Sequence, residues 1–219
     1  MLSVIIPVLN ANDTLSATLD CLQAGRDAAG IGEIIVADGG SKVLPQHQHI
    51  RLIRGAPGRG VQMAAGAAAA GGDWLLFLHA DTVPGEGWQQ AVAMHMATSS
   101  KAAVFVFKLD DEGKRARVLE LLVKWRCTLF ALPYGDQGLL VSRQLYNETG
   151  GFKPIPLMED VDIIRRIGRS RLAFLDAHAI TSAARYTRDG YLRRMMRNMA
   201  CLVMWFTGVS PQRIAGFYK

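Results

Sequence analysis

The sequence predicts an α/β fold with a mainly parallel sheet covered by helices on both faces. Apolar, β-branched runs such as "SVIIPVL" alternate with segments of helical period through the first half of the chain. The 219 residues are 50% hydrophobic and 20% charged, which suits one globular domain with a sizeable core. No internal repeat or linker interrupts this order. We therefore expect one domain over 1–219, with a first half at 1–110 and a second half at 111–219.

The first half reads as strands and helices in alternation. Strands are expected in "SVIIPVL", "GEIIVADGG", "IRLIRG", "DWLLFLHAD" and "KAAVFVFKLD". Helices are expected in "NDTLSATLDCLQA", with Asn12 or Asp13 as its cap, in the alanine-rich "GRGVQMAAGAAAAGG" and in "GEGWQQAVAMHMATS".

The second half has a different style. It contains a long helical stretch, "KRARVLELLVKWRCTLFAL", a loop and short strand in "PYGDQGLLVSRQLYNETGGF", an amphipathic helix opening with acids in "MEDVDIIRRIGRS", and a strand in "RLAFLDAHAITSA". The tail "RDGYLRRMMRNMACLVMWFTG" predicts one basic amphipathic helix. Its apolar run is too short for a spanning helix. We favour core packing for Leu202, Trp205 and Phe206, with contact to a membrane surface as the alternative.

Charge is unevenly distributed. The formal net charge is +6, yet residues 165–219 contain eleven Lys or Arg against two acids, and the first 164 residues contain 14 against 17. A basic tail indicates an anionic partner: a diphosphate, membrane headgroups or nucleic acid. A solvated helix face is the alternative.

The three cysteines are scattered and form no CxxC pair, which favours a reducing compartment. The N-terminus "MLSVIIPVLN" reads as a first strand and not as a signal peptide. These features predict a cytoplasmic protein, with a peripheral location at the inner face of the membrane as the alternative that the tail adds.

Polar residues follow several of the predicted strands. Because ligands of parallel sheets bind beyond the carboxyl ends of the strands, Asn10, Asp38, His79 and Asp81 point to a site at one edge. In an extended segment His79 and Asp81 face the same side, so both are candidates to address one Mg²⁺ or Mn²⁺ shared with a diphosphate. Alternatively, Asp81 caps the helix after Pro84 and His79 is hydrogen-bonded locally.

Two glycine-rich segments are candidates for nucleotide contacts. Asp38 in "VADGGS" is placed to accept hydrogen bonds from a ribose or a base, or to form a simple Asp-Gly turn. "GAPGRGVQMAAG" offers backbone N–H groups and Arg59 to a phosphate at a helix start. It matches neither a Walker motif nor a dinucleotide GxGxxG pattern.

The acids of "MEDVD" admit two interpretations. Glu159, Asp160 and Asp162 fall in the first turn of a predicted helix, where its dipole alone stabilises them. The other interpretation is that one of them faces a substrate hydroxyl as general base, presented by a loop that Pro154 and Pro156 fix.

Taken together, these segments resemble family 2 glycosyltransferases of the GT-A fold. "SVIIPVLN", "EIIVADGGS", "GDWLLFLHADT", "GDQGLLVSRQLYNETGGF" and "MEDVDIIRRI" occur in the family's order. The chain is most similar to the small bacterial branch often labelled radical-SAM/selenodomain-associated transferase. The resemblance implies a GT-A-type, Rossmann-like sheet in a single domain with a C-terminal amphipathic helix, a nucleotide-binding half at 1–110 and an acceptor-side half at 111–219.

The resemblance also implies roles for individual residues. Asp160, in the pair with Glu159, would be the base of a hexosyltransferase-like inverting transfer, and Asp81 would hold a divalent cation on the donor diphosphate. Substrate-binding roles are implied for Pro7, Val8, Asn10, Asp38, Gly39, Arg59, Gln62, His79, Asp136 and Gln137. The expected partners are a nucleotide-sugar donor and an acceptor that is either free or lipid-linked, with no nucleic acid.

The sequence departs from the family pattern in three places. His79 stands where the first Asp of a DxD motif is usual, "NANDTL" lacks the Glu that often follows Asn, and "SAARY" stands where QxxRW would be. The last departure argues against a processive polysaccharide synthase. Two alternatives remain: a sugar-nucleotide nucleotidyltransferase, whose basic signature loop is missing after the first strand, and a non-catalytic binding protein on the same scaffold.

Overall fold

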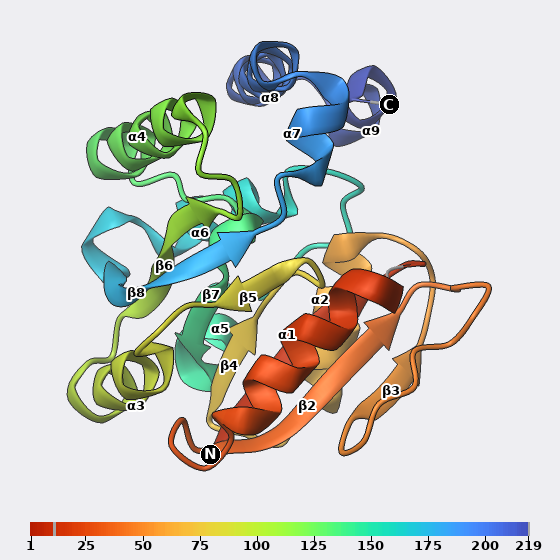
Figure 1. Ribbon diagram of the computed structural model, residues 1–219, viewed down its shortest axis with the longest axis vertical. Helices are drawn as coiled ribbons and strands as arrows, with labels where there is room; N and C mark the ends of the chain where they lie inside the picture. Colours follow the sequence, from red (N-terminus) through yellow and green to blue (C-terminus); the bar gives the residue numbers. More distant parts are fainter. Residues whose placement is uncertain (11, 219) are drawn as a thin grey trace.

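One eight-stranded sheet organises the molecule, which is described here by a computed structural model for residues 1–10 and 12–218. The strands follow the order β3-β2-β1-β4-β7-β6-β8-β5 (Figure 1). Their bounds are β1 Leu2–Val8, β2 Ile31–Asp38, β3 Arg51–Arg54, β4 Trp74–Phe77, β5 Thr82–Pro84, β6 Ala102–Leu109, β7 Leu139–Ser142 and β8 Leu172–Thr181. The pairs β3-β2, β2-β1, β1-β4 and β6-β8 are parallel, and β7 and β5 run antiparallel to their neighbours. The predicted mainly parallel α/β sheet is confirmed.

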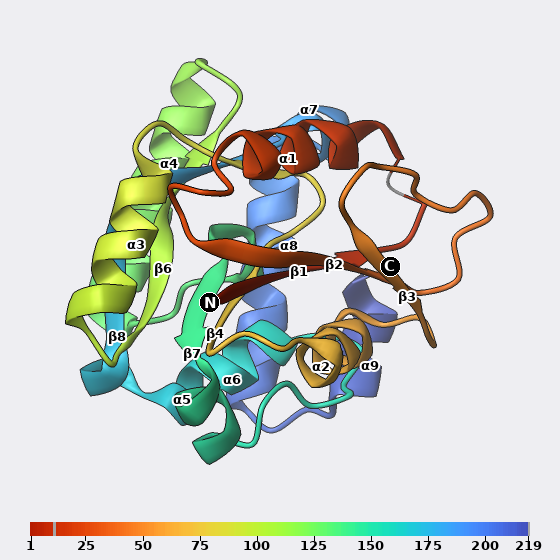
Figure 2. The same ribbon diagram turned by 90° about the horizontal axis from the view of Figure 1, so that it is seen from below.

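Helices cover both faces of this sheet. Their bounds are α1 Asn12–Ala24, α2 Arg59–Ala69, α3 Trp88–Thr98, α4 Lys114–Phe130, α5 Arg143–Glu148, α6 Glu159–Ile167, α7 Ala184–Asp189, α8 Tyr191–Phe206 and α9 Pro211–Tyr218. Figure 2 shows α1 on one face of β1 and β2, and α2, α5 and α6 on the other. A further group, α4, α7, α8 and α9, lies at the upper end of Figure 1, beyond the carboxyl ends of the parallel strands.

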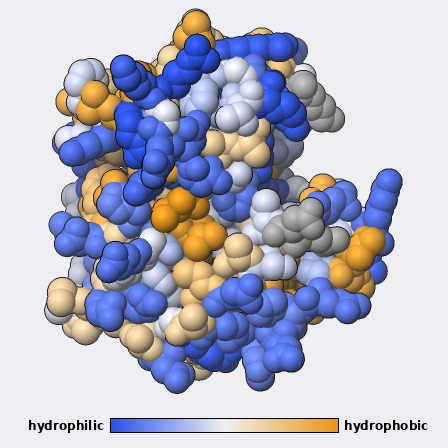
Figure 3. Space-filling view, in the orientation of Figure 1, coloured by the Kyte–Doolittle hydropathy of each residue, from blue (hydrophilic) through white to orange (hydrophobic). Residues whose placement is uncertain are grey.

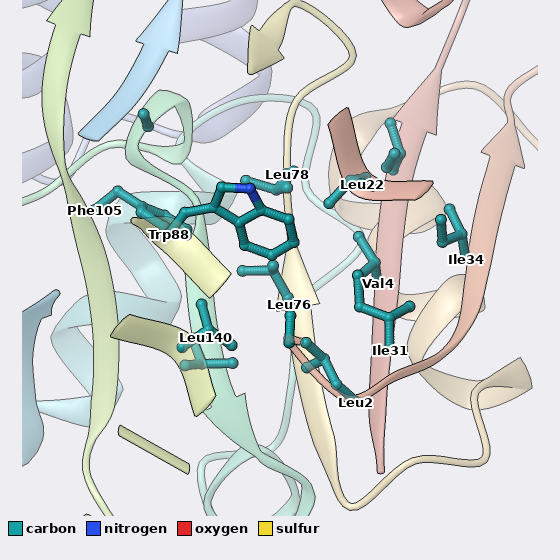
Figure 4. Packing of buried hydrophobic residues seen from close by; sticks show 14 of the residues in the cluster. Leu2, Val4, Leu22, Ile31, Ile34, Leu76, Leu78, Trp88, Phe105 and Leu140 are labelled. Carbon is teal, nitrogen blue, oxygen red and sulfur yellow. The ribbon is translucent and has the colours of Figure 1, made fainter. Parts of the chain in front are cut away.

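Alternation along the strands builds two cores, one on each face. In β1, Val4 and Ile6 join the cluster under α1 and α3, whereas Ile5 joins the cluster under α2, α5 and α6. Trp88, at the start of α3, is 2% exposed and belongs to the first cluster, as do Leu76 and Phe105 (Figure 4). The two cores fix which face of the sheet each helix covers.

The sheet curls because β4 and β5 are joined by only four residues, 78–81, yet lie far apart in the strand order. β5 forms the edge of the sheet that is opposite β3 and pairs with β8. The hydroxyls of Thr82 in β5 and Thr181 in β8 lie 3.0 Å apart. Thr18 of α1 donates its hydroxyl to the carbonyls of Ala80 and Thr82, which fixes the bridge from the helix side. The residues between β4 and β5 are therefore held at both ends.

The C-terminal segment differs from its prediction. The single expected helix is three, α7, α8 and α9, since Gly190, with a φ of 86°, ends α7 and precedes α8. Leu202 is buried as expected, but Phe206 is 48% exposed, so the expectation of core packing is wrong for Phe206. It lies on the outer face of an amphipathic helix. The proposed cap at Asn12 or Asp13 falls on side chains outside the described residues.

None of the helices within 1–10 and 12–218 is both long and apolar enough to cross a bilayer.

Replacing Trp88 with Ala is expected to lower the free energy of unfolding by about 3–5 kcal/mol, because it opens a cavity in the core. Trp125 on α4 is 56% exposed and serves as the matched control, with an expected change of about 0.5 kcal/mol or less for the same substitution. Urea unfolding of the two variants measures both values. Equal losses at the two positions would contradict the assignment of Trp88 to the core.

Candidate functional site

A cavity lies between the carboxyl ends of the strands and the C-terminal helices. Its lining includes predicted site residues from the body of the domain, namely Arg59, His79, Asp81, Asp136 and Asp160, and residues from β8 to α9, namely Thr181, Ser182, Arg185, Tyr186, Arg194, Asn198, Cys201 and Tyr218. The surface is notched on the right of Figure 3, between the C-terminal helices and the part formed by α1, β2 and β3. Five predicted site residues thus meet in one place.

The turn between β4 and β5 presents His79 and Asp81. The strand ends at Phe77, and the N–H of Thr82 donates to the His79 carbonyl at 3.2 Å, so the extended geometry expected for 79–81 is wrong. The two side chains line the same cavity but have different partners: His79 contacts Arg59, and Asp81 pairs with Arg185 at 2.6 Å. Asp81 does not cap the next helix, whose cap, Gly87, makes no side-chain hydrogen bond.

His79 is held as a neutral imidazole. Burial, together with the positive charges of Arg59 and Arg185, keeps the pKa of His79 well below its ordinary value. Nη1 of Arg59 lies 3.3 Å from its Nε2. Because a guanidinium only donates, Nε2 accepts this bond and is engaged by Arg59 in this arrangement.

Asp160 is presented at the start of α6. Met158, in the left-handed region with a φ of 67°, turns the chain into the helix, and the Gly135 N–H donates to Oδ2 of Asp160 at 2.8 Å. A Cβ on residue 135 would meet Nε2 of His79 at 2.7 Å and Oδ2 of Asp160 at 3.4 Å. Glycine at 135 is therefore what lets its backbone pass between these two side chains.

Glu159 faces away from the cavity and into the protein. Its side chain is 1% exposed, and Oε1 lies 2.9 Å from Nε of Arg59, whose side chain is 38% exposed. Neither oxygen of Glu159 accepts a hydrogen bond from a described residue. Burial raises the pKa of Glu159 to about 7, against the lowering effect of Arg59. The geometry makes Glu159 a support for Arg59, which itself lines the cavity.

Asp136 and Gln137 lie side by side on the short 3₁₀ turn Gly135–Gln137 but differ in their contacts. Burial raises the pKa of Asp136 to about 6, with the negative charges of Asp160 and Asp81 adding to the effect, and its Oδ1 is buried without a described partner. Gln137 is 2% exposed and donates to the Phe105 carbonyl at 3.0 Å. Asp136 is thus available to a ligand, whereas Gln137 fixes the turn to β6.

The ends of β1 and β2 form a second group of predicted residues, outside the cavity lining. Asp38 is 1% exposed, and its carboxylate accepts the N–H groups of Gly40 and Ser41 at 3.1 Å each. Burial alone would raise the pKa of Asp38, but hydrogen bonds from Ser41 and Gly40 and the charge of Arg54 lower it overall. Asn10 accepts the Lys42 N–H at 3.0 Å and so ties the two loops together.

Gln62 clamps these same two strands. It is 5% exposed and donates to the carbonyls of Val8 and Ala37, both at 2.7 Å. Gly39 packs against this amide, where a Cβ would come within 3.0 Å of it, and Pro7 is buried within β1. In this structure Pro7, Val8, Gly39 and Gln62 shape the strand ends.

The C-terminal half of the cavity wall was not predicted residue by residue. Arg185 and Tyr186 of α7, Arg194 and Asn198 of α8, and Tyr218 of α9 all line it. The excess of positive charge after residue 165 was the signal for this wall, and "SAARY" contains three of the lining residues, Ser182, Arg185 and Tyr186. Sequence alone did not show which of the basic residues point inward.

The donor set fits a divalent cation only if the cation is shared with a ligand. Among the described residues, no group of three or more His, Cys, Asp or Glu side chains is arranged to hold a metal ion. Asp81 offers one carboxylate in the cavity, at 14% exposure. Mg²⁺ and similar cations are commonly held by one or two carboxylates plus phosphate oxygens, so Asp81 suits a cation that arrives with a diphosphate.

Comparison with known proteins identifies a family. The sequence profile described as "Glycosyl transferase family 2" matches residues 3–155. A search of the curated proteins returns no match.

Solved structures share the fold. Residues 1–349 of TarS from S. aureus align with a TM-score of 0.60 and 16% identity over 93% of this chain and 65% of that one. Glucosyl-3-phosphoglycerate synthase from Mycobacterium tuberculosis, in complex with Mn²⁺, uridine diphosphate and phosphoglyceric acid, aligns with a TM-score of 0.59 and 22% identity over 83% of this chain and 69% of that one. TarS has also been solved with UDP-GlcNAc. The chain spans about two thirds of the length of these structures.

Substituting Glu159 with Gln is expected to stabilise the protein increasingly as the pH rises from about 5 to 8. Burial raises the pKa of this carboxyl group from its ordinary value of 4.5 to about 7 in the folded protein. Between these values the native state binds more protons than the unfolded state, so the wild type loses stability as pH rises, and a glutamine does not. Urea unfolding across this range, with the exposed Glu86→Gln as control, measures the difference. A pH-independent difference would contradict the burial of a titrating carboxyl group at 159.

Proposed function

The chain belongs to glycosyl transferase family 2, and we propose that it moves one sugar from a nucleotide-sugar donor to an acceptor hydroxyl with inversion at the anomeric carbon. The observation that supports this best is the meeting of Asp160 with His79, Asp81 and Arg59 around one cavity at the carboxyl edge of the sheet. A carboxylate base and a cationic diphosphate site are the two parts that such a transfer requires. The order of the sequence motifs supports a further proposal, that the chain belongs to the small bacterial branch of radical-SAM/selenodomain-associated transferases.

Asp160 is the proposed base. The Gly135 N–H holds Oδ2 of Asp160 in place, so the carboxylate is oriented before any acceptor arrives. It takes the proton of the acceptor hydroxyl as the oxygen attacks the anomeric carbon. The bond from that carbon to the diphosphate oxygen breaks at the same time, and the nucleoside diphosphate leaves with the electron pair. A single displacement of this kind inverts the configuration.

Two guanidinium groups are proposed to receive the leaving diphosphate. Arg59 stands at the first residue of α2, where helix N–H groups also favour an anion. Arg185 reaches the cavity from α7 and is paired with Asp81. Fixed positive charge aimed at the developing negative charge lowers the barrier to departure. Glu159 is proposed to keep Arg59 aimed at this position.

Asp81 is proposed to hold the divalent cation, Mg²⁺ or Mn²⁺, together with the donor diphosphate. When bound, the cation neutralises charge on the diphosphate. Asp81 can bind the cation once Arg185 moves away from the carboxylate, from which its guanidinium lies 2.6 Å in this structure. His79 accepts from Arg59 and is proposed to align that side chain with the diphosphate.

The donor and acceptor are proposed by class. The similar structures were solved with uridine diphosphate or a UDP-sugar, which supports a nucleotide-sugar donor for this chain. For the nucleoside, Asp38 is the proposed contact from the sequence motif, although its carboxylate is engaged by its own turn. Movement of Gly40 and Ser41 would release it. The acceptor, free or lipid-linked, approaches Asp160 along the wall formed by α7, α8 and α9.

Replacing Asp160 with Asn is expected to lower the turnover of sugar transfer on the order of 10²–10⁴-fold while donor affinity stays close to that of the wild type. The asparagine oxygen can still accept the Gly135 N–H but cannot take a proton. Release of nucleoside diphosphate from a panel of nucleotide sugars measures turnover, and calorimetry measures donor affinity. Asp176→Asn on the exposed side of β8 is the control. Wild-type turnover in Asp160→Asn would remove it as the base.

Replacing Asp81 with Ala is expected to abolish the gain in affinity for uridine diphosphate that Mn²⁺ gives the wild type. Asp81 supplies the carboxylate that the cation shares with the diphosphate, so without it Mn²⁺ adds no protein contact. The substitution also frees Arg185 from its pair with Asp81, and this changes the affinity for uridine diphosphate whether or not Mn²⁺ is present. Calorimetric titrations with and without Mn²⁺ therefore isolate the contribution of the cation. An equal gain from Mn²⁺ in wild type and variant would eliminate Asp81 as a ligand.

A further inference from the structure

The helices α4 and α8 each expose a stripe of large apolar side chains. On α8 the exposed residues are Leu192, Met196, Met199, Val203 and Phe206, spaced by four, three, four and three residues, and on α4 they are Val118, Leu121, Leu122, Trp125, Leu129 and Phe130. Such spacing places the α8 set, and the α4 set as far as Leu129, along one side of their helix, whereas Phe130 is seven residues after the buried Val123 and so falls on the inner side at the helix end. Several residues of the stripes are more than half exposed, including Leu192 at 67% and Trp125 at 56%.

These stripes are not the faces by which the helices pack onto the protein. The inner side of α4 is formed by Ala116, Leu119, Val123 and Cys127, which belong to a buried cluster with the tyrosines of α7 and α8. The inner side of α8 includes Arg194, Cys201 and Leu202. Both helices are therefore apolar on two sides, and the outer side stays largely exposed, although the guanidinium of Arg165 lies 4.9 Å from the ring centroid of Phe206 at the end of α8. Contiguous exposed apolar surface of this kind marks an interaction site.

The two stripes meet in a groove between the first turns of α4 and α8. Val118, Leu122 and Leu192 lie in its wall, and its volume is about 530 Å³. Lys114, Arg115 and Arg193 also line it, and none of its lining residues is acidic. Apolar and hydrophilic surface lie next to each other at this upper end of the molecule in Figure 3.

Charge selects the kind of partner. Together α4 and α8 contain eight Lys or Arg and one acid, Glu120, which is paired with Arg117. A twofold dimer through this surface would bring the same cations face to face, which is unfavourable. A bilayer with anionic headgroups offers negative charge to the basic residues and acyl chains to the apolar stripes, as interfacial amphipathic helices require.

We propose that the outer face of α4 and α8 is a docking surface for an anionic phospholipid bilayer, with the groove at Lys114, Arg115 and Arg193 receiving a lipid. Docking would set the bilayer against the back of α8, whose inner side lines the cavity through Arg194, Asn198 and Cys201. The proposal does not depend on the transfer reaction, because a bilayer binds this face whether or not the cavity is catalytic.

Vesicle flotation tests the proposal. The protein is expected to bind vesicles of equal parts phosphatidylcholine and phosphatidylglycerol, to bind vesicles of phosphatidylcholine alone much more weakly, and to dissociate at high salt. The triple variant Lys114→Gln, Arg115→Gln, Arg193→Gln should bind the anionic vesicles about a hundredfold more weakly, since each basic residue contributes roughly fivefold. The pair Val118→Ser, Leu192→Ser should weaken binding at least about tenfold.

Matched controls lie elsewhere on the surface. Met94→Ser removes a side chain that is 67% exposed on α3, and Lys101→Gln removes an exposed cation, and both should bind like the wild type. All changes are on exposed residues, and circular dichroism verifies that each variant is folded. Donor hydrolysis measured without vesicles should be the same in the wild type and the two groove variants, which separates this test from that of the transfer reaction.

Three results would overturn the proposal. They are equal binding to neutral and anionic vesicles, undiminished binding by the triple variant, and no binding to anionic vesicles. In the last case, a dimer that the Val118→Ser, Leu192→Ser pair abolishes in sedimentation would assign the surface to a second copy of the chain. Binding to an acidic protein without binding to vesicles would assign it to a protein partner and would equally rule out the bilayer.

Discussion

The ion pair between Arg59 and Glu159 joins the two halves of the chain at the site. Arg59 begins α2 and Glu159 begins α6, so one contact of 2.9 Å fixes two helix starts relative to each other. Gly60 makes the approach possible, because a Cβ there would come within 2.3 Å of the Lys153 carbonyl. The position of Asp160, one residue further along α6, follows from this pair. Separating this pair would leave the buried carboxylate of Glu159 without its cation, which costs free energy. This cost opposes any movement of α2 relative to α6.

The fold was largely predictable because its signals are local. Apolar, β-branched runs and helical spacing identified nearly all of the strands and helices, and glycine pairs marked the ends of one strand and one helix. The predictions failed where geometry depends on distant parts of the chain. Residues 79–81 look extended in sequence, yet pairing of β5 with β8 turns them. Likewise, a single positive φ at Gly190 divides the tail, and no periodicity reveals it.

The sequence predicted which residues meet at the site better than it predicted what each of them does there. The motifs brought Arg59, His79, Asp81, Asp136 and Asp160 together, and the structure places them around one cavity. Glu159 and Gln137 could not be separated from these by sequence, because adjacent polar residues of one motif do not reveal which of them points toward a cavity. The structure separates them by burial: each is at most 2% exposed, Glu159 is paired with Arg59, and Gln137 donates to the Phe105 carbonyl. Roles that depend on a ligand still rest on the proposed reaction.

The bridge between β4 and β5 has a further consequence, which concerns the entropy of binding. Most ligand-contacting loops are anchored loosely and must become ordered when the ligand arrives. Residues 78–81 are instead held between two paired strands and by the hydroxyl of Thr18. The backbone of His79 and Asp81 is therefore already ordered, and only side-chain freedom is lost on binding. Of the ligand-facing segments, this one should show the smallest change in hydrogen-exchange protection on donor binding, while the turn at Gly40 and Ser41 should change more.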